Sequence, residues 1–165
     1  MLDSYSQQAK MVLFIARARA GQRGSHEVGI KHLLEAIVME DQEPERYAGS
    51  ALGVLPVAGT IRGRTSEVRS NPFFSSQTAA ALLTKLNETT TIRDQPVPTS
   101  EDLPVSEELE RTLAAAEELS RLYEGNRVKP LHLLGAALAE PSDATQFFFE
   151  AGITRDSVLE DLREK

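Results

Sequence analysis

The chain has 165 residues and no cysteine, 41% of its residues are hydrophobic, and its formal net charge is −7 at pH 7. This length suits one domain with a sizeable core. The lack of cysteine excludes disulfides, thiolate zinc sites and a cysteine nucleophile. An acidic chain lacks the basic face that nucleic acids require. No apolar run is long enough to cross a bilayer and residues 1–4 do not begin a signal peptide, so we expect a cytoplasmic protein without a membrane partner.

The first predicted element is a helix that begins after Ser6 and ends near Gly21. The Ser6 hydroxyl is suited to accept a hydrogen bond from an amide of the first turn. Apolar residues then recur every three or four positions, as on a helix with one buried face, at Ala9, Val12, Leu13, Ala16 and Ala20. A second, shorter helix is predicted from His32 to Met39, and the acidic run 40–44 is expected to end it. Two more helices are predicted over about 45–52 and 56–61.

Residues 63–104 have the least regular pattern, and we interpret them as an inserted linker segment. Ser75 or Ser76 is suited to cap one helix, whose apolar positions are Ala79, Leu82, Leu83 and Leu86. Three prolines between 94 and 104 favour an extended chain. We expect Phe73 and Phe74 to attach the segment to the core rather than to form an exposed docking site.

The pattern of the last part of the chain favours four helices. Ser106 is suited to cap the first, whose apolar stripe consists of Leu109, Leu113, Ala116, Leu119 and Tyr123. Pro130 suits the first turn of the next helix, and Pro141 ends it. Ser142 or Asp143 is expected to cap a third helix and Thr154 a fourth. The third carries Phe147, Phe148 and Phe149, which cannot all face inward because neighbours on a helix lie about 100° apart.

The stretch 5–38 recurs, without a gap, as the stretch 105–138. A shift of 100 pairs identical residues, among them Ser6, Leu13, Ala16, Val28, His32, Leu33, Leu34 and Ala36. Apolar positions persist while charged positions diverge, as in two copies of one packed unit. The repetition predicts two helical halves related by a pseudo-twofold axis, each completing the core of the other.

These residues resemble the Clp N-terminal repeat, which occurs twice at the head of Clp-type AAA+ unfoldases. The resemblance rests on Ser6, on Val28 and on the run His32-Leu33-Leu34, each with its counterpart 100 residues later. It implies one all-α domain of about eight helices, a pseudo-twofold tandem repeat of two four-helix units. We assign repeat one to 1–62, the inserted linker to 63–104 and repeat two to 105–165.

The resemblance also implies a function in protein binding. The family uses this domain to bind protein substrates and adaptor proteins, and its ATP-binding modules have no counterpart in these residues. We therefore expect a non-catalytic module without a cofactor or metal, whose partners are protein substrates, adaptors or a Clp unfoldase and which regulates proteolysis. It would be a monomer or a weak homo-oligomer. The alternative is a self-associating scaffolding protein with no Clp partner.

Some family members recognise phosphorylated arginine through a Glu directly before the motif His, beside a Ser or Thr at the first cap. Ser6 and Ser106 match the cap. The Glu positions are Lys31 and Leu131, and lysine repels a guanidinium while leucine offers it no charge. We do not expect phosphoarginine recognition in the family's manner.

The remaining candidate for partner binding is the seam between the repeats. Its residues are Tyr5, Ser6, Ile30, Lys31, Val105, Ser106 and Leu131. Their largely apolar character suits a hydrophobic or extended peptide segment. The alternative is that Tyr5, Ile30 and Val105 only pack helix starts against the core.

Catalytic motifs are weak in this sequence. His32 and His132 lack neighbouring Asp, Glu or His at ligand spacing, and we expect each imidazole to satisfy backbone groups at a helix start. Ser25-His26 is interpreted as a local turn. The glycine-containing stretch 59–65 is one residue short of a phosphate-binding loop and has Arg64 in place of its lysine.

The charge is unevenly distributed between the two copies. Residues 1–24 carry four basic residues and one acidic residue, whereas residues 101–124 carry eight acidic and two basic residues. Two solvated helix faces explain this pattern, and so does a polarised surface that orients a partner or drives head-to-tail association.

Overall fold

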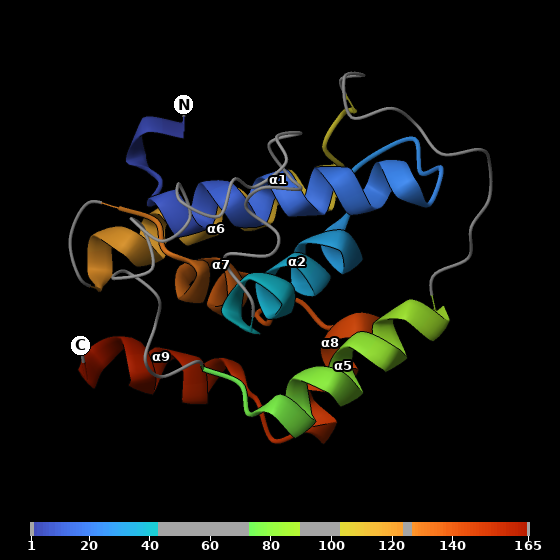
Figure 1. Ribbon diagram of the computed structural model, residues 1–165. Coiled ribbons are helices and arrows are strands. Elements are labelled where there is room, and N and C mark those ends of the chain that lie inside the picture. Colours follow the sequence, from blue (N-terminus) through green and yellow to red (C-terminus); the bar gives the residue numbers. More distant parts are fainter. Residues whose placement is uncertain (1, 43–72, 90–102, 124–126, 165) are drawn as a thin grey trace, which may run out of the picture.

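The computed structural model describes residues 2–42, 73–89, 103–123 and 127–164. These residues form helices and no strand (Figure 1), which confirms the prediction of an all-α fold. The elements are a 3-10 helix at Leu2–Ser4 and the α-helices α1 (Gln7–Gln22), α2 (Ile30–Gln42), α5 (Ser76–Thr89), α6 (Glu107–Leu122), α7 (Pro130–Ala137), α8 (Asp143–Glu150) and α9 (Arg155–Glu164). The helices expected over 45–52 and 56–61 lie outside the described residues.

The helix starts follow the capping residues of the sequence. The Ser6 hydroxyl accepts a hydrogen bond from the Ala9 amide at 3.1 Å, and the Ser106 hydroxyl accepts one from the Leu109 amide at the same distance. Of the two caps proposed for α8, Ser142 is the one observed. A short polar side chain placed before an apolar run therefore fixes where these helices begin.

Helix α2 is longer than predicted. It continues through the acidic residues to Gln42, and Glu40 and Asp41 are both buried. The Asp41 carboxylate accepts the Phe73 and Phe74 amides, each at 2.9 Å, and the Gln42 side chain donates to the Phe74 carbonyl at 2.8 Å. The first three residues of the acidic run remain helical, and the Asp41 carboxylate there receives backbone amides from a segment about thirty residues away.

Helices α2 and α7 form the centre of the molecule. Helix α1 packs on α2 and α6 packs on α7, while α1 also touches α7 and α6 also touches α2. All residues of α7 are buried. Helices α5, α8 and α9 lie on the other side of this pair from α1 (Figure 1). The predicted duplication thus appears as two outer helices over two inner ones.

Helix α5 lies in the segment interpreted as an inserted linker, yet it belongs to the core. It packs against α2, as α9 packs against α7, and it also contacts α8. Leu82 and Leu86 are buried, and the Phe74 ring lies edge-on to Phe148 with 6.1 Å between centroids. The expectation that Phe73 and Phe74 attach this segment to the core agrees with these contacts. Of the three consecutive rings of α8, only Phe148 is fully buried.

Candidate functional site

The seam between the repeats begins at a backbone junction between residues 28 and 105. The Val28 amide donates to the Pro104 carbonyl at 2.9 Å, and the Ser106 amide donates to the Val28 carbonyl at 3.0 Å. The segment before α6 therefore pairs in parallel, over one bridge, with the segment before α2. Ile30 and Lys31 open α2 directly after this junction.

A second junction repeats the same geometry with the roles of the two copies exchanged. The Val128 amide donates to the Ser4 carbonyl at 2.7 Å, and the Ser6 amide donates to the Val128 carbonyl at 2.9 Å. Subtracting or adding 100 converts each bond of one junction into a bond of the other. Each repeat thus supplies the backbone partners for the cap segment of the other. Such reciprocal exchange is expected of halves that complete one another.

The structure divides the seven predicted site residues between these two junctions. Tyr5 and Ser6 lie at the junction that precedes α1, where the backbone pairs with Val128, and Leu131 belongs to the same junction because it follows Val128 at the start of α7. The remaining four lie at the other junction and are Ile30, Lys31, Val105 and Ser106. Because α1 separates Tyr5 from Val28, and its 16 residues extend about 24 Å, the seven residues do not form one continuous surface.

Burial separates the seam residues further. Tyr5, Ser6, Ile30 and Leu131 are buried. Lys31 and Ser106 are half-buried, and Val105 is 38% exposed. The part of the seam that reaches solvent is therefore a small patch at the junction between Val28 and Val105. Of the buried members, Ile30 lies at this junction, whereas Tyr5, Ser6 and Leu131 lie at the other one.

Tyr5 connects the start of α1 to α6. Its hydroxyl donates to the Glu117 carboxylate at 3.5 Å across 112 residues of sequence. Burial, and then the neighbouring Glu117 charge, raise the pKa of the Tyr5 phenol to about 12. The phenol is therefore a protonated donor at neutral pH and has a structural role in the seam.

The two repeated histidines act as helix-start acceptors. His32 Nδ1 accepts the Gly29 amide at 3.0 Å, and His132 Nδ1 accepts the Lys129 amide at 2.9 Å. His132 is fully buried, and its Nε2 lies 3.2 Å from the Tyr123 carbonyl. Both side chains satisfy backbone groups, as predicted. Within the described ranges no three His, Asp, Glu or Cys side chains are grouped to hold a metal ion.

The Ser25-His26 pair belongs to a local turn. The Ser25 hydroxyl donates to the Glu27 carbonyl at 2.8 Å, so it is engaged with its own loop. His26 is exposed. This arrangement agrees with the turn interpretation and offers no oriented nucleophile. The stretch 59–65 lies outside the described residues.

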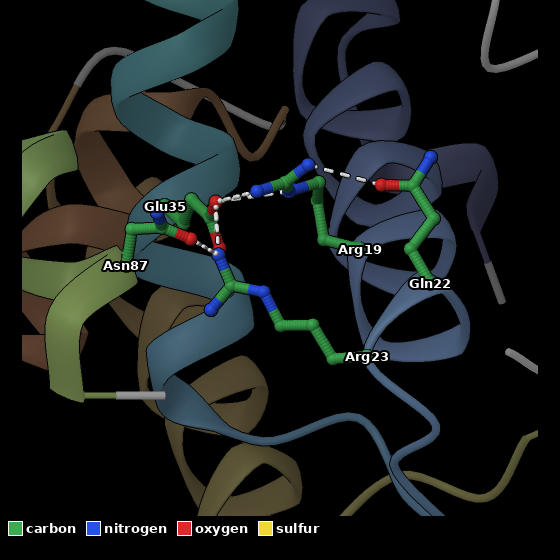
Figure 2. A network of polar contacts seen from close by, with 5 residues as sticks. All are labelled: Arg19, Gln22, Arg23, Glu35 and Asn87. Atoms are coloured by element: carbon green, nitrogen blue, oxygen red, sulfur yellow. Dashed lines mark hydrogen bonds and ion pairs between the residues drawn. The ribbon is translucent and has the colours of Figure 1, made fainter. Parts of the chain in front are cut away.

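Sequence reasoning missed a cluster of charged residues where α1, α2 and α5 meet (Figure 2). Glu35 Oε1 receives Arg19 at 2.7 Å and Arg23 at 2.9 Å, and Arg23 also donates to the Asn87 amide oxygen at 2.9 Å. Glu35 and Arg23 are buried. Glu35 directly follows Leu33 and Leu34 in the sequence. The helical spacing of these apolar residues was the one sequence pattern that could have predicted its burial. The cluster joins α5 to the first two helices.

The cluster replaces an apolar contact of the second repeat. The residue equivalent to Glu35 is Gly135, where an added Cβ would lie 3.4 Å from Leu119 and 3.5 Å from Val158. Leu119 is in turn the counterpart of Arg19. One interface between an outer and an inner helix is thus held by ion pairs in one copy and by close apolar packing in the other.

The fold is similar to that of solved Clp N-terminal domains. Solved structures of this kind cover nearly the whole chain. The N-terminal domain of the chaperone ClpD from Arabidopsis thaliana is 17% identical, with 97% of this chain and 92% of that chain covered and a TM-score of 0.56. The Hsp104 N-terminal domain from Candida albicans is 16% identical, with 96% and 88% covered and a TM-score of 0.58.

A third similar structure comes from structural investigations of a malarial protein secretion system. It is 19% identical, 98% of this chain and 93% of that chain are covered, and the TM-score is 0.65. No protein-family model matches the chain, and no curated protein matches it in sequence. The chain therefore has a Clp N-terminal-like fold, as its repeated motif predicted. In the parts of the chain described, no helix has both the length and the apolar character needed to cross a membrane.

Proposed function

We propose that this chain is a non-catalytic protein-binding module that recognises protein substrates, adaptor proteins or a regulatory partner of a Clp-type chaperone or protease machine. The observation that carries the proposal is the Clp N-terminal-like fold, shared over nearly the whole chain with the N-terminal domains of ClpD and Hsp104. The seam residues support it by supplying a solvent-exposed patch between the repeats.

The patch has a defined chemistry. Val105 is 38% exposed and pairs with Val28, which precedes the half-buried Lys31 by three residues. An apolar side chain next to a cation suits an extended segment with an apolar residue beside an acidic one. Lys31 and the buried Leu131 occupy the positions of the family's Glu, so neither position supplies a carboxylate for a guanidinium. The proposed ligand is therefore an unmodified or acidic segment.

The test is a crosslinking pulldown from native lysate with the purified chain as bait. The double variant Lys31→Glu, Val105→Glu reverses the charge of the patch and removes its apolar side chain. The wild type is expected to recover a Clp unfoldase, an adaptor or a set of clients, and the double variant is expected to lose most of that set. Both positions are partly exposed, so the variant is expected to fold.

A matched control makes the same kinds of change far from the patch. Arg155 and Ala151 are exposed, beside or within the last two helices, and Arg155→Glu with Ala151→Glu should leave the recovered set unchanged. Recovery of the bait alone, or equal losses from both double variants, would contradict the proposal. A normal circular dichroism spectrum and melting temperature of each variant exclude unfolding as the cause.

A further inference from the structure

The exposed large apolar side chains gather at the two outer helices. Among the described residues these side chains are Phe14, which is 42% exposed, Val105 and Leu122, which is 75% exposed. Phe14 lies on α1, Leu122 ends α6, and Val105 precedes α6. Elsewhere in the described core, large apolar side chains are buried or half-buried. Exposed apolar side chains concentrated on one pair of elements are typical of an interaction surface.

The same two helices carry opposite charge. Helix α1 contains no acidic residue and three basic ones, of which Arg19 is paired with Glu35, whereas α6 contains five glutamates and two arginines. Lys10 is half-buried on α1, and Glu110 and Glu118 are exposed on α6. Because unlike charges attract across an interface and like charges oppose association, a surface with this division is complementary to a second copy of itself.

The junctions fix how α1 and α6 run relative to each other. Tyr5, before α1, reaches Glu117 in the second half of α6, and Val28, after α1, pairs with Val105 before α6. The two helices are therefore antiparallel, and the shift of 100 places Phe14 and Ala114 at equivalent central positions. Ala114 is exposed, so a small side chain on the acidic helix corresponds to the exposed ring on the basic one.

We propose that two copies of this chain form a twofold dimer in which α1 of each copy lies on α6 of its partner. A twofold axis parallel to the helices places Phe14 against Ala114 of the second copy and Lys10 opposite Glu118. The axis repeats each contact, so that one interface contains two aromatic contacts and two ion pairs. The alternative twofold axis, across the helices, places α1 against α1 and is disfavoured by like charge. This dimer requires no Clp partner.

The test is sedimentation velocity over a range of protein concentrations. We expect the wild type to dimerise at low salt and to dissociate as ionic strength rises, because exposed charges are screened within about 10 Å at 0.1 M salt. Lys10→Glu and Glu118→Lys should each raise the dimer dissociation constant about tenfold, since every substitution places two like-charge pairs in the interface. The double variant should recover the wild-type constant to within about twofold.

The control variant is Glu160→Lys, which makes the same charge change on exposed α9, and it should leave the dissociation constant unchanged. Phe14→Ser should weaken the dimer by a salt-independent amount. Monomeric behaviour at every concentration and salt would overturn the proposal, as would a double charge variant no tighter than the single ones. Because these variants leave Lys31 and Val105 intact, loss of dimerisation without loss of the pulldown set separates this proposal from the proposed function.

Discussion

His32 and His132 carry the same imidazole at equivalent positions, and each accepts the amide three residues before it. Their surroundings differ. His32 lies near Arg19, Arg23 and Lys31, and burial first, then these cations, lower the pKa of His32 to about 4. Two of these cations, Arg19 and Arg23, belong to the cluster around Glu35, which the second repeat replaces with apolar packing.

The lowered pKa of His32 predicts a pH dependence of stability. The unfolded chain binds a proton at His32 near pH 6.5, the ordinary value, whereas the folded chain does so only near pH 4. The neutral imidazole therefore stabilises the fold fully above pH 6.5, and this contribution, about 3 kcal/mol, is lost as the pH falls to 4. Urea unfolding at pH 7 and pH 4.5 measures the difference.

The matched variant for this measurement is His32→Asn, whose side-chain oxygen can still accept the Gly29 amide but does not titrate. Its free energy of unfolding should fall less between pH 7 and pH 4.5 than that of the wild type, by about 2–3 kcal/mol. Parallel pH profiles for the two proteins would show that His32 is not the titrating group.

Helix α5 shows how tertiary contacts decide the role of an element. Its apolar positions predicted a helix, but the prolines and polar residues around it favoured a linker. In the structure its start is held by Asp41 and its last turns by Arg23 through Asn87. Lys85 adds a surface ion pair with Glu150 at 3.3 Å. The helix is anchored at both ends to the first repeat and along its side to α8.

We predict that Leu82→Ala in α5 lowers the free energy of unfolding by about 2–4 kcal/mol, the range for deleting a buried leucine side chain. Leu82 is 1% exposed. The partly buried Leu83 provides the comparison, and Leu83→Ala should cost clearly less. Chemical denaturation followed by circular dichroism measures both. Equally small effects would mean that α5 behaves as a detachable insert.

The reciprocal junctions make each repeat depend on the other for backbone hydrogen bonds. Each copy supplies backbone partners to the cap segment of the other, and α2 contacts α7 directly. Neither half retains the hydrogen bonds of these junctions when the other unfolds. The single domain over 1–165, with repeat limits at 62 and 105, remains a prediction, and cooperativity between the halves is the property that tests it.

Native-state hydrogen exchange measures this cooperativity. Leu33 and Leu133 are equivalent and fully buried. Leu133→Ala, in the second copy, should lower the exchange free energy of the Leu33 amide by as much as it lowers the global free energy of unfolding, about 2–5 kcal/mol. Leu33→Ala should act in the same way on the Leu133 amide. Unchanged protection in the opposite copy would indicate two independently unfolding units.

Much of the fold follows from local signals in the sequence. Ser6, Ser106 and Ser142 each mark a helix start by offering an acceptor to the first turn, and the repetition at a shift of 100 predicts the paired architecture. The structural role of His32 and His132 was predictable for the same reason. Each imidazole accepts a hydrogen bond from the backbone amide three residues before it, which is a local contact.

The other features of the fold and of the candidate site were decided by the tertiary structure alone, because contacts between distant segments supply the free energy that stabilises them. The sequence did not show that Asp41 would remain helical, since its carboxylate accepts hydrogen bonds from the distant backbone amides of Phe73 and Phe74. Nor did it show that Glu35 would be buried between two arginines. It named the seam residues but not their division between two junctions about one helix length apart. Local hydrogen bonding is encoded within a few residues, whereas burial and charge pairing depend on which distant segments the fold brings together.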